Sequence, residues 1–170
     1  MALGTGARPG EVLAIRWCDL DLAAPVPLLT ICGTVIRNST KGLHRQDWTK
    51  TDAGYRTVLL PQFVVDTLRR VKLEATTNEL DLVFPDRKGG VREPHNFRRT
   101  WRQARGTTFA WITGKTFRKT VATLIAEEYG PAQAASQLGH ADGGDVARKH
   151  YIDKPSQVDD FTPALDRFKH

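Results

Sequence analysis

The feature that most constrains the fold is a run of helix signals in the C-terminal half of the chain. Helical patterns follow one another from His95 onward, and two of them close at Gly130 and Gly139. Glycine commonly ends a helix because it adopts left-handed backbone angles without a steric cost, and Pro131 suits the first position of the next helix. We therefore predict three consecutive helices, over 96–105, 116–129 and 131–138.

The N-terminal half mixes helix and strand signals. A helical apolar pattern follows Pro9, a β-rich run covers 28–36, and residues 48–61 are typical of a hairpin with two short strands around Asp52-Ala53-Gly54. An amphipathic helix is expected over 63–75, and the tail over 162–169 is again helical. The pattern predicts one mostly helical α+β domain with a small antiparallel β-sheet near its N-terminus.

The length and composition exclude several classes of protein. At 170 residues, with 40% hydrophobic and 26% charged residues, the chain suits one domain with its own core. It shows neither a signal-peptide pattern nor the roughly 20 apolar residues of a membrane span. Its two cysteines form no CxxC pair and no metal-ligand cluster, which favours a reduced, cytoplasmic interior.

Positive charge is concentrated in one segment. The net charge is +6, and the stretch from Arg87 to Lys119 holds ten Lys and Arg against a single acid, Glu93. A basic stretch can be an ordinary solvated helix face. Its confinement to part of the chain, with Trp101, Phe109 and Trp111 interleaved, instead favours a polyanion such as nucleic acid. The residues assigned to DNA contact are Arg98, Arg99, Arg102, Arg105 and Lys119.

The stretch GKTFRKTVAT, from Gly114 to Thr123, superficially resembles the end of a nucleotide-binding P-loop. A P-loop needs another glycine five positions before the Gly-Lys pair, and that position is Phe109. A nucleotide site is therefore excluded. Lys115 and Arg118 still lie one turn apart at a helix start, where cations gain nothing from the helix dipole unless an anion is bound there. This favours a phosphate that is not a nucleotide's.

Several other residues have both an ordinary and a chemical interpretation. Arg8 and Glu11 at a helix start, Lys50 beside a turn, His140 after a helix-closing glycine and Tyr151 in an amphipathic segment could each be structural. Taken together they suggest phosphoryl transfer without a metal. Arginines grip phosphate oxygens in pairs, a lysine can protonate a leaving oxygen, and a tyrosine can be a covalent nucleophile.

Over residues 3–154 the chain resembles the tyrosine recombinases, or phage-type integrases. TGARPGEVLAIRW is similar to their first arginine box, WTKTDAGYRTVLLP to their β-hairpin and GKTFRKTVATLI to their His-x-x-Arg box. QLGH matches their Leu-Gly-His motif, and KHYIDK carries the tyrosine. The resemblance implies six catalytic residues, with Glu11 supporting the first arginine: Arg8, Lys50, Lys115, Arg118, His140 and the nucleophile Tyr151. Lys115 departs from the family pattern, because it stands where histidine is common.

The resemblance implies site-specific DNA recombination through a 3′-phosphotyrosyl intermediate, with no cofactor and no metal. Double-stranded DNA is the expected partner. The protein is expected to be monomeric when free and tetrameric on DNA. Its expected location is the cytoplasm of a bacterial host, in association with the nucleoid. Residues 1–154 would form the catalytic domain, truncated at its N-terminus and without a core-binding domain. Residues 155–170 would be a C-terminal tail that docks on a neighbouring subunit or, equally, on its own domain.

Two alternatives remain open. A type IB topoisomerase-like enzyme has the same chemistry and carries Lys-x-x-Arg where Lys115 and Arg118 stand, although the Leu-Gly-His motif and the short interval to Tyr151 favour a recombinase. A catalytically idle DNA-binding remnant of an integrase is the other. Tyr129 and His150 are weaker candidates for nucleophile and base.

Overall fold

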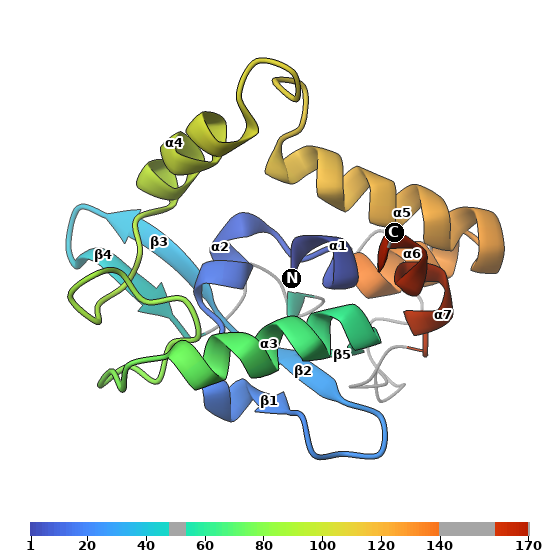
Figure 1. The fold of residues 1–170 in the computed structure, drawn as a ribbon, viewed down its shortest axis with the longest axis horizontal. Helices are drawn as coiled ribbons and strands as arrows, with labels where there is room; N and C mark the ends of the chain where they lie inside the picture. The colour runs from blue at the N-terminus through green and yellow to red at the C-terminus, as the bar shows by residue number, and fades with distance from the viewer. Residues whose placement is uncertain (48–53, 140–158, 170) are drawn as a thin grey trace.

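The computed structural model describes residues 1–47, 54–139 and 159–169. The N-terminal half holds short helices and all the strands: α1 (Ala2–Thr5), α2 (Pro9–Leu13), η1 (Trp17–Asp19), β1 (Leu20–Asp21), β2 (Leu28–Ile31), β3 (Thr34–Asn38), β4 (Gly42–Gln46) and β5 (Arg56–Leu59). Four longer helices follow in the described part of the chain: α3 (Gln62–Glu74), α4 (Pro94–Arg105), α5 (Gly114–Tyr129) and α6 (Pro131–Leu138). Two short helices, α7 (Thr162–Leu165) and η4 (Asp166–Lys169), lie near the C-terminus. The mostly helical α+β class is confirmed (Figure 1).

The described strands form two antiparallel sheets, where the sequence predicted one. β1, β2 and β5 make a three-stranded sheet with β2 in the middle, and β3 pairs only with β4. The run 28–36 was predicted as one strand, but it is split between the two sheets. The split falls at Gly33, where the backbone passes so close to β4 that a Cβ would lie 2.8 Å from the carbonyl oxygen of Gln46. The second strand of the predicted 48–61 hairpin exists as β5, and it pairs with β2.

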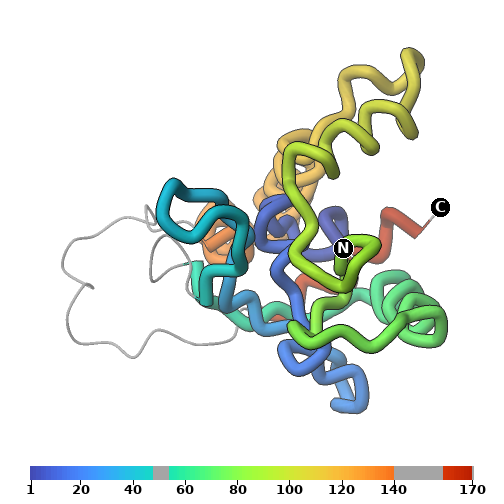
Figure 2. Tube along the Cα trace, turned by 90° about the vertical axis from the view of Figure 1, so that its left-hand side faces the viewer, coloured from blue at the N-terminus to red at the C-terminus, as the bar shows by residue number. Residues whose placement is uncertain are grey.

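The core forms where helices cover the three-stranded sheet. α3 lies across one face of this sheet in Figure 1. α5 and α6 run together on the side of α1 that is away from the sheet. Buried side chains from the sheet and α3, such as Leu29, Val58 and Leu68, share one apolar cluster with Val121 and Ile125 of α5. α4 and the loop that follows it stand out from this body as an arm (Figure 2).

The helix predictions of the C-terminal half are confirmed in place and type. α5 ends at Tyr129 with Gly130 as its C-cap. α6 ends at Leu138 with Gly139 as its C-cap, and the φ of Gly139, 63°, is left-handed. The helix after Pro9 is shorter than its apolar pattern indicated, because α2 stops at Leu13. Beyond it the chain pairs with a distant segment: Val83 donates to the Ile15 carbonyl at 2.9 Å, and Trp17 donates to that of Asp81 at 2.9 Å. Tertiary pairing has replaced further helix.

The C-terminal tail packs on its own domain. Phe161 and Leu165 are buried in the main core cluster, and the Phe161 ring lies 5.1 Å from that of Tyr129. Arg167 forms an ion pair with Glu128 at the end of α5. This is one of the two placements that the spacing allowed, and docking on a second subunit stays a prediction. Among the described residues, no helix has the length and apolarity to cross a membrane.

Candidate phosphate-binding site

Arg8 and Glu11 are joined by the way α2 begins. Arg8 is the N-cap residue and Pro9 opens the helix, a position that suits proline because no backbone donor is needed there. The Glu11 carboxylate reaches back and accepts from the Arg8 backbone N–H at 2.9 Å and from its guanidinium at 2.8 Å. Glu11 is buried, whereas the Arg8 side chain is 48% exposed. The buried Glu11 therefore orients the Arg8 guanidinium, and the other side of the guanidinium is open to solvent.

A second arginine, Arg56, grips the same carboxylate from inside the protein. It is the first residue of β5, and its buried guanidinium donates to Glu11 Oε2 at 3.2 Å, to the Gln137 carbonyl at 2.8 Å and to the Gly54 carbonyl at 2.9 Å. Arg56 was not among the site residues expected from the sequence. The available signal was strand alternation, because Arg56 has the same inward register as Val58.

Arg118 completes the group from the second turn of α5. Its two terminal nitrogens donate to the Gly6 carbonyl at 2.6 Å and to the Leu138 carbonyl at 2.5 Å. It thereby ties the end of α1 to the last turn of α6. Gly6, whose carbonyl accepts from Arg118, has a φ of 66°, a left-handed angle that glycine adopts readily. Arg118, which lies far from Arg8 and Glu11 in the sequence, thus comes close to them where α1, α2, α5 and α6 end or begin.

The electrostatics are those of a site with excess positive charge. Burial alone would raise the pKa of Glu11, but Arg56 and the contacts from Arg8 outweigh it and hold the pKa below its ordinary value. Burial is the main cause that lowers the pKa of Arg118 to about 10. The nearby positive charges of Arg8 and Arg56 lower this pKa further, whereas the negative charge of Glu11 opposes the shift. Among the described residues here, three guanidiniums face one carboxylate. Such a cluster favours an anion.

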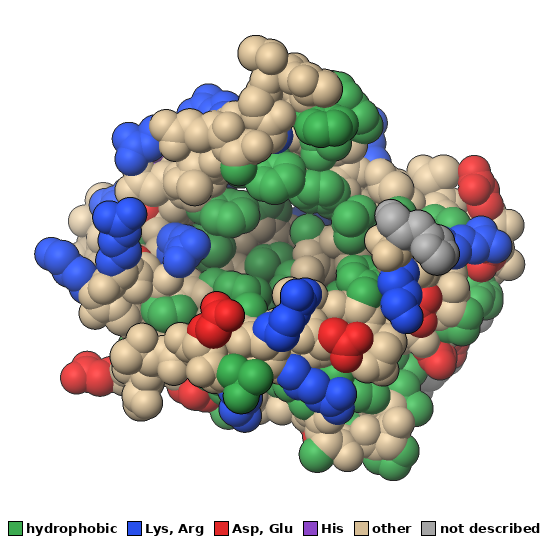
Figure 3. Space-filling model, in the orientation of Figure 1, with side chains coloured by type: hydrophobic (Ala, Val, Ile, Leu, Met, Phe, Trp, Pro, Cys, Tyr) green, Lys and Arg blue, Asp and Glu red, His purple; other side chains and the backbone are tan. Residues whose placement is uncertain are grey.

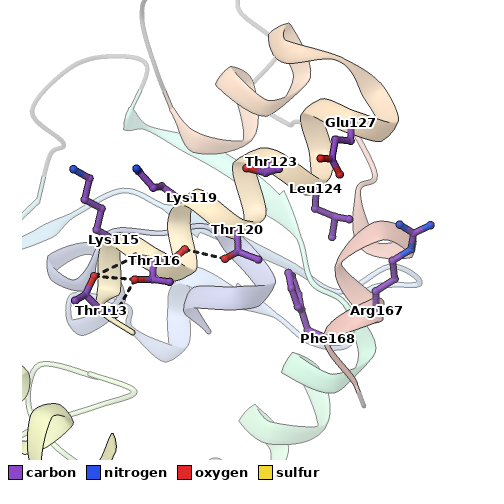
Figure 4. A pocket seen from close by; sticks show the side chains of 10 residues that line it. All are labelled: Thr113, Lys115, Thr116, Lys119, Thr120, Thr123, Leu124, Glu127, Arg167 and Phe168. Carbon is purple, nitrogen blue, oxygen red and sulfur yellow. Dashed lines mark hydrogen bonds between the residues drawn. The ribbon is translucent and has the colours of Figure 1, made fainter. Parts of the chain in front are cut away.

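Lys115 does not join this group. It is exposed on the first turn of α5 and lines a groove between α5 and the C-terminal tail, whereas Arg118 faces α1 and α6. In Figure 4, Lys115 and Lys119 extend to the same side of α5, away from Phe168. Thr113 caps the helix by accepting from the Thr116 N–H at 3.3 Å. The α5 start is thus capped by its own side chains, with Lys115 directed outward.

The four arginines assigned to DNA contact lie on α4 in the arm, whereas the fifth assigned residue, Lys119, lies on α5. Arg98, Arg99 and Arg102 are exposed on α4, and Arg105 is half-buried because it donates to the Ile112 carbonyl. Trp101 is used in packing: its ring meets that of Phe117 edge-on at 5.4 Å, and its indole N–H donates to Ile112. Figure 3 shows Lys and Arg side chains gathered around α4 and the β3–β4 hairpin. A surface of this kind is a suitable electrostatic footprint for a polyanion.

The comparisons with known proteins give the family. The model of the phage integrase family matches residues 1–157, which is most of the chain. The chain belongs to the phage integrase family. A search of curated proteins found no match.

Solved structures share the fold of this integrase-family chain. The Tn1549 transposon integrase in complex with circular intermediate DNA is 18% identical, with a TM-score of 0.65, and the match covers 84% of this chain and 50% of that one. XerA recombinase is 21% identical at a TM-score of 0.58, covering 84% and 47%. XerH site-specific recombinase bound to its difH substrate is 20% identical at 0.60, covering 84% and 38%. The chain thus spans half or less of each of these proteins.

Three expected catalytic residues of the integrase-family chain lie outside the described residues: Lys50, His140 and Tyr151. The structure brings the end of α6, directly before His140, against Arg118, and it brings the start of β5, shortly after Lys50, against Glu11. No group of three or more His, Cys, Asp or Glu side chains that could hold a metal occurs in the described part of the chain.

Proposed function

We propose that this chain is the catalytic domain of a site-specific DNA recombinase that cuts and rejoins DNA through a tyrosine. The observation that carries the proposal is the meeting of Arg8 and Arg118 around Glu11 in a member of the phage integrase family. Arginine binds phosphate through parallel N–H bonds, which suits a phosphodiester. The structural neighbours include an integrase and a recombinase solved with DNA, which agrees with double-stranded DNA as the partner.

The proposed reaction is an in-line displacement at phosphorus. Tyr151 gives its phenol proton to water and attacks the scissile phosphate, so that a 3′-phosphotyrosyl bond forms while the bond to the 5′-oxygen breaks. Lys50 donates a proton to that leaving oxygen. Arg8, Arg118 and His140 bind the non-bridging oxygens, where negative charge grows in the transition state. The 5′-hydroxyl of a partner strand then reverses the attack.

We further propose the assembly, the domain extent and the compartment of the protein. The cations that stabilise the phosphate are side chains, so no step requires a metal or a cofactor. Residues 1–154 form the catalytic domain, and four copies assemble on two DNA duplexes, whereas the free protein is monomeric. The bacterial cytoplasm, at the nucleoid, is the compartment where such a protein meets its DNA. The exposed arginines of α4 contact the DNA backbone.

A nicked suicide substrate tests the proposal. Cleavage releases a short 5′-hydroxyl strand that diffuses away, so a covalent protein–DNA adduct accumulates and is visible on a denaturing gel. We expect the adduct with the wild-type protein and none with Tyr151→Phe. An adduct that survives Tyr151→Phe contradicts the assigned nucleophile, and specific DNA binding without any adduct indicates the idle remnant. Relaxation of supercoiled DNA without strand exchange between two sites indicates the topoisomerase-like alternative.

A further inference from the structure

Arg56 connects three segments of the chain that surround the phosphate-binding site. Its guanidinium donates to the Glu11 carboxylate of α2, to the Gln137 carbonyl in the last turn of α6, and to the Gly54 carbonyl just before β5. Its side chain is only 4% exposed, so it has no free face to offer a DNA phosphate. Whatever it does for the reaction must pass through the groups that it holds.

We propose that Arg56 is a positioning residue for the DNA cleavage reaction: it fixes Glu11, and through it Arg8, and it fixes the end of α6 that leads into His140. This inference rests on the proposed function. It gives a role to a residue that lies within the WTKTDAGYRTVLLP hairpin motif but was not among the expected site residues. Arg56 touches neither the DNA nor the reacting atoms.

The contact with Glu11 sets the position of Arg8. Glu11 accepts from Arg8 through both of its oxygens, one bonded to the backbone N–H and the other to the guanidinium. Arg56 shares the oxygen that binds the Arg8 backbone N–H. If Arg56 is lost, the buried carboxylate loses its interior partner, and it must rotate, protonate or admit water to recover one. Each of these changes alters the carboxylate that holds Arg8, and each is therefore expected to displace the exposed Arg8 guanidinium.

The contact with Gln137 sets the end of α6. The last carbonyls of a helix have no partner within the helix, and here two neighbouring ones are held by arginines, Gln137 by Arg56 and Leu138 by Arg118. Arg118 is thus constrained on the same turn that Arg56 holds. Catalytic groups displaced by about 1 Å can lose about a hundredfold in rate, so a change at Arg56 is expected to reach the reaction.

Arg45 provides a matched control within the same molecule. It is also an arginine on a strand, and its side chain is only 7% exposed. It likewise donates to a carbonyl, that of Ala14 at 2.7 Å, and it pairs with two carboxylates, Asp19 at 3.4 Å and the exposed Asp47. None of its contacts reaches Glu11, Arg118 or α6. A general cost of disturbing a buried arginine is therefore shared by the two residues, whereas an effect on the phosphate site belongs to Arg56 alone.

The experiment compares Arg56→Lys, Arg56→Gln, Arg45→Lys and Arg45→Gln in the full chain. DNA affinity is measured on an intact site, single-turnover cleavage is measured at saturating protein on a nicked suicide substrate, and thermal melting gives the folded fraction. Lysine keeps the charge but cannot reach three acceptors at once, so Arg56→Lys is expected to cleave about tenfold more slowly with DNA affinity within about threefold of wild type. Arg56→Gln is expected to lose about a hundredfold. Both Arg45 variants, once corrected for folding, are expected to cleave within about threefold of wild type.

The outcomes separate this inference from the proposed function. If the wild-type protein forms no adduct, the proposed function fails and the inference with it. If the wild-type protein cleaves and Arg56→Lys cleaves at the same rate, only the inference is overturned. Equal rate losses in Arg56→Lys and Arg45→Lys also overturn it, because they show a general effect of buried arginines. Should Arg56→Gln not fold, Arg56→Lys carries the test, since it keeps a cation in the buried position.

Discussion

At the scale of single residues, the centre of the site is a carboxylate between two guanidiniums. Glu11 is buried and hydrogen-bonded to Arg8, and it is paired with Arg56 at 3.2 Å. A buried carboxylate is stable only when its partners compensate the loss of water, and here they do so well enough to lower its pKa. Glu11 therefore organises the arginines and is itself held charged by them.

Glu11→Gln tests this role through the pH dependence of stability. In the folded protein the pKa of Glu11 is lowered from its ordinary value of about 4.5. The charged carboxylate therefore contributes its full stabilisation above about pH 4.5, and this stabilisation is lost as the pH falls through the folded-state pKa. Glu11→Gln is expected to be destabilised by about 3 kcal/mol at pH 7, with the difference from wild type shrinking below pH 4.5. Urea unfolding between pH 7 and pH 3 measures it. Glu74→Gln, at an exposed position on α3 with no contact to the site, serves as the control and should cost less than about 0.5 kcal/mol at pH 7.

Lys115 is the other residue whose role can be measured. It is exposed on α5 and does not contact Arg8, Glu11 or Arg56 through any described hydrogen bond, so Lys115→Ala should leave the melting temperature unchanged. If it only adds positive charge near the DNA, single-turnover cleavage falls about tenfold, whereas Arg118→Ala falls at least about a hundredfold. A loss as large as that of Arg118→Ala would instead assign proton transfer to Lys115.

The sequence predicts the site at this scale where a motif marks it. Arg8, Glu11 and Arg118 were predicted together, and the structure places them together. Arg56 was missed because its importance comes from burial and from contacts with α2 and α6, which lie 45 and 81 positions away along the chain. Composition carries no sign of such contacts. The position of Lys115 outside the cluster also depends on which side of α5 faces the core.

At the scale of elements, the site is made by the junctions between short helices. Local signals predicted these helices well when a proline opened or a glycine closed them, as at Pro131 and Gly130. They failed where a distant partner decided the structure. α2 stops early because the chain after it pairs with residues near Leu82, and the β-rich run splits because β3 pairs with β4 instead of β2. Strand pairing is a tertiary property, and a single strand pattern does not name its partner.

Gly6 tests the junction between α1 and α2. A Cβ at this position would lie 2.6 Å from Leu138 Cδ2 and 3.1 Å from Val121 Cγ1, and the Gly6 carbonyl accepts from Arg118. We expect Gly6→Ala to destabilise the protein by about 3 kcal/mol and to slow cleavage, because both left-handed strain and overpacking act there.

Gly42→Ala is the matched control for Gly6→Ala. Gly42 has nearly the same φ, 64° against 66°, but nothing lies within 4 Å of its Cβ position. Its cost should be the backbone strain alone, about 1 kcal/mol, with cleavage unchanged. Urea unfolding and single-turnover cleavage measure both variants. Equal costs at the two positions would show that the close approach of Gly6 to α6 does not matter.

At the scale of the whole molecule, the proposed function assigns DNA contact to two separate regions, the site and the basic arm. Arg8 and Arg118, held in place by Glu11 and the buried Arg56, form a small site that is proposed to bind one phosphate. The exposed arginines of α4 lie on an element that stands out from the body (Figure 2) and can reach several phosphates along a duplex. Affinity is therefore expected to come mainly from the arm, and cleavage from the cluster.

Arg102→Ala tests this division. Each phosphate contact releases counterions, so the logarithm of the binding constant falls with the logarithm of salt by about 0.9 per contact on duplex DNA. Removing the exposed Arg102 should weaken binding to all sequences alike and reduce that slope by about 0.9, while the cleavage rate at saturating protein stays within about threefold of wild type. Arg70→Ala, an exposed arginine of α3 away from the arm, should leave the slope unchanged. A cleavage defect in Arg102→Ala that persists at saturation would mean that the arm also positions the DNA for cutting, and that binding and catalysis are not separate in this fold.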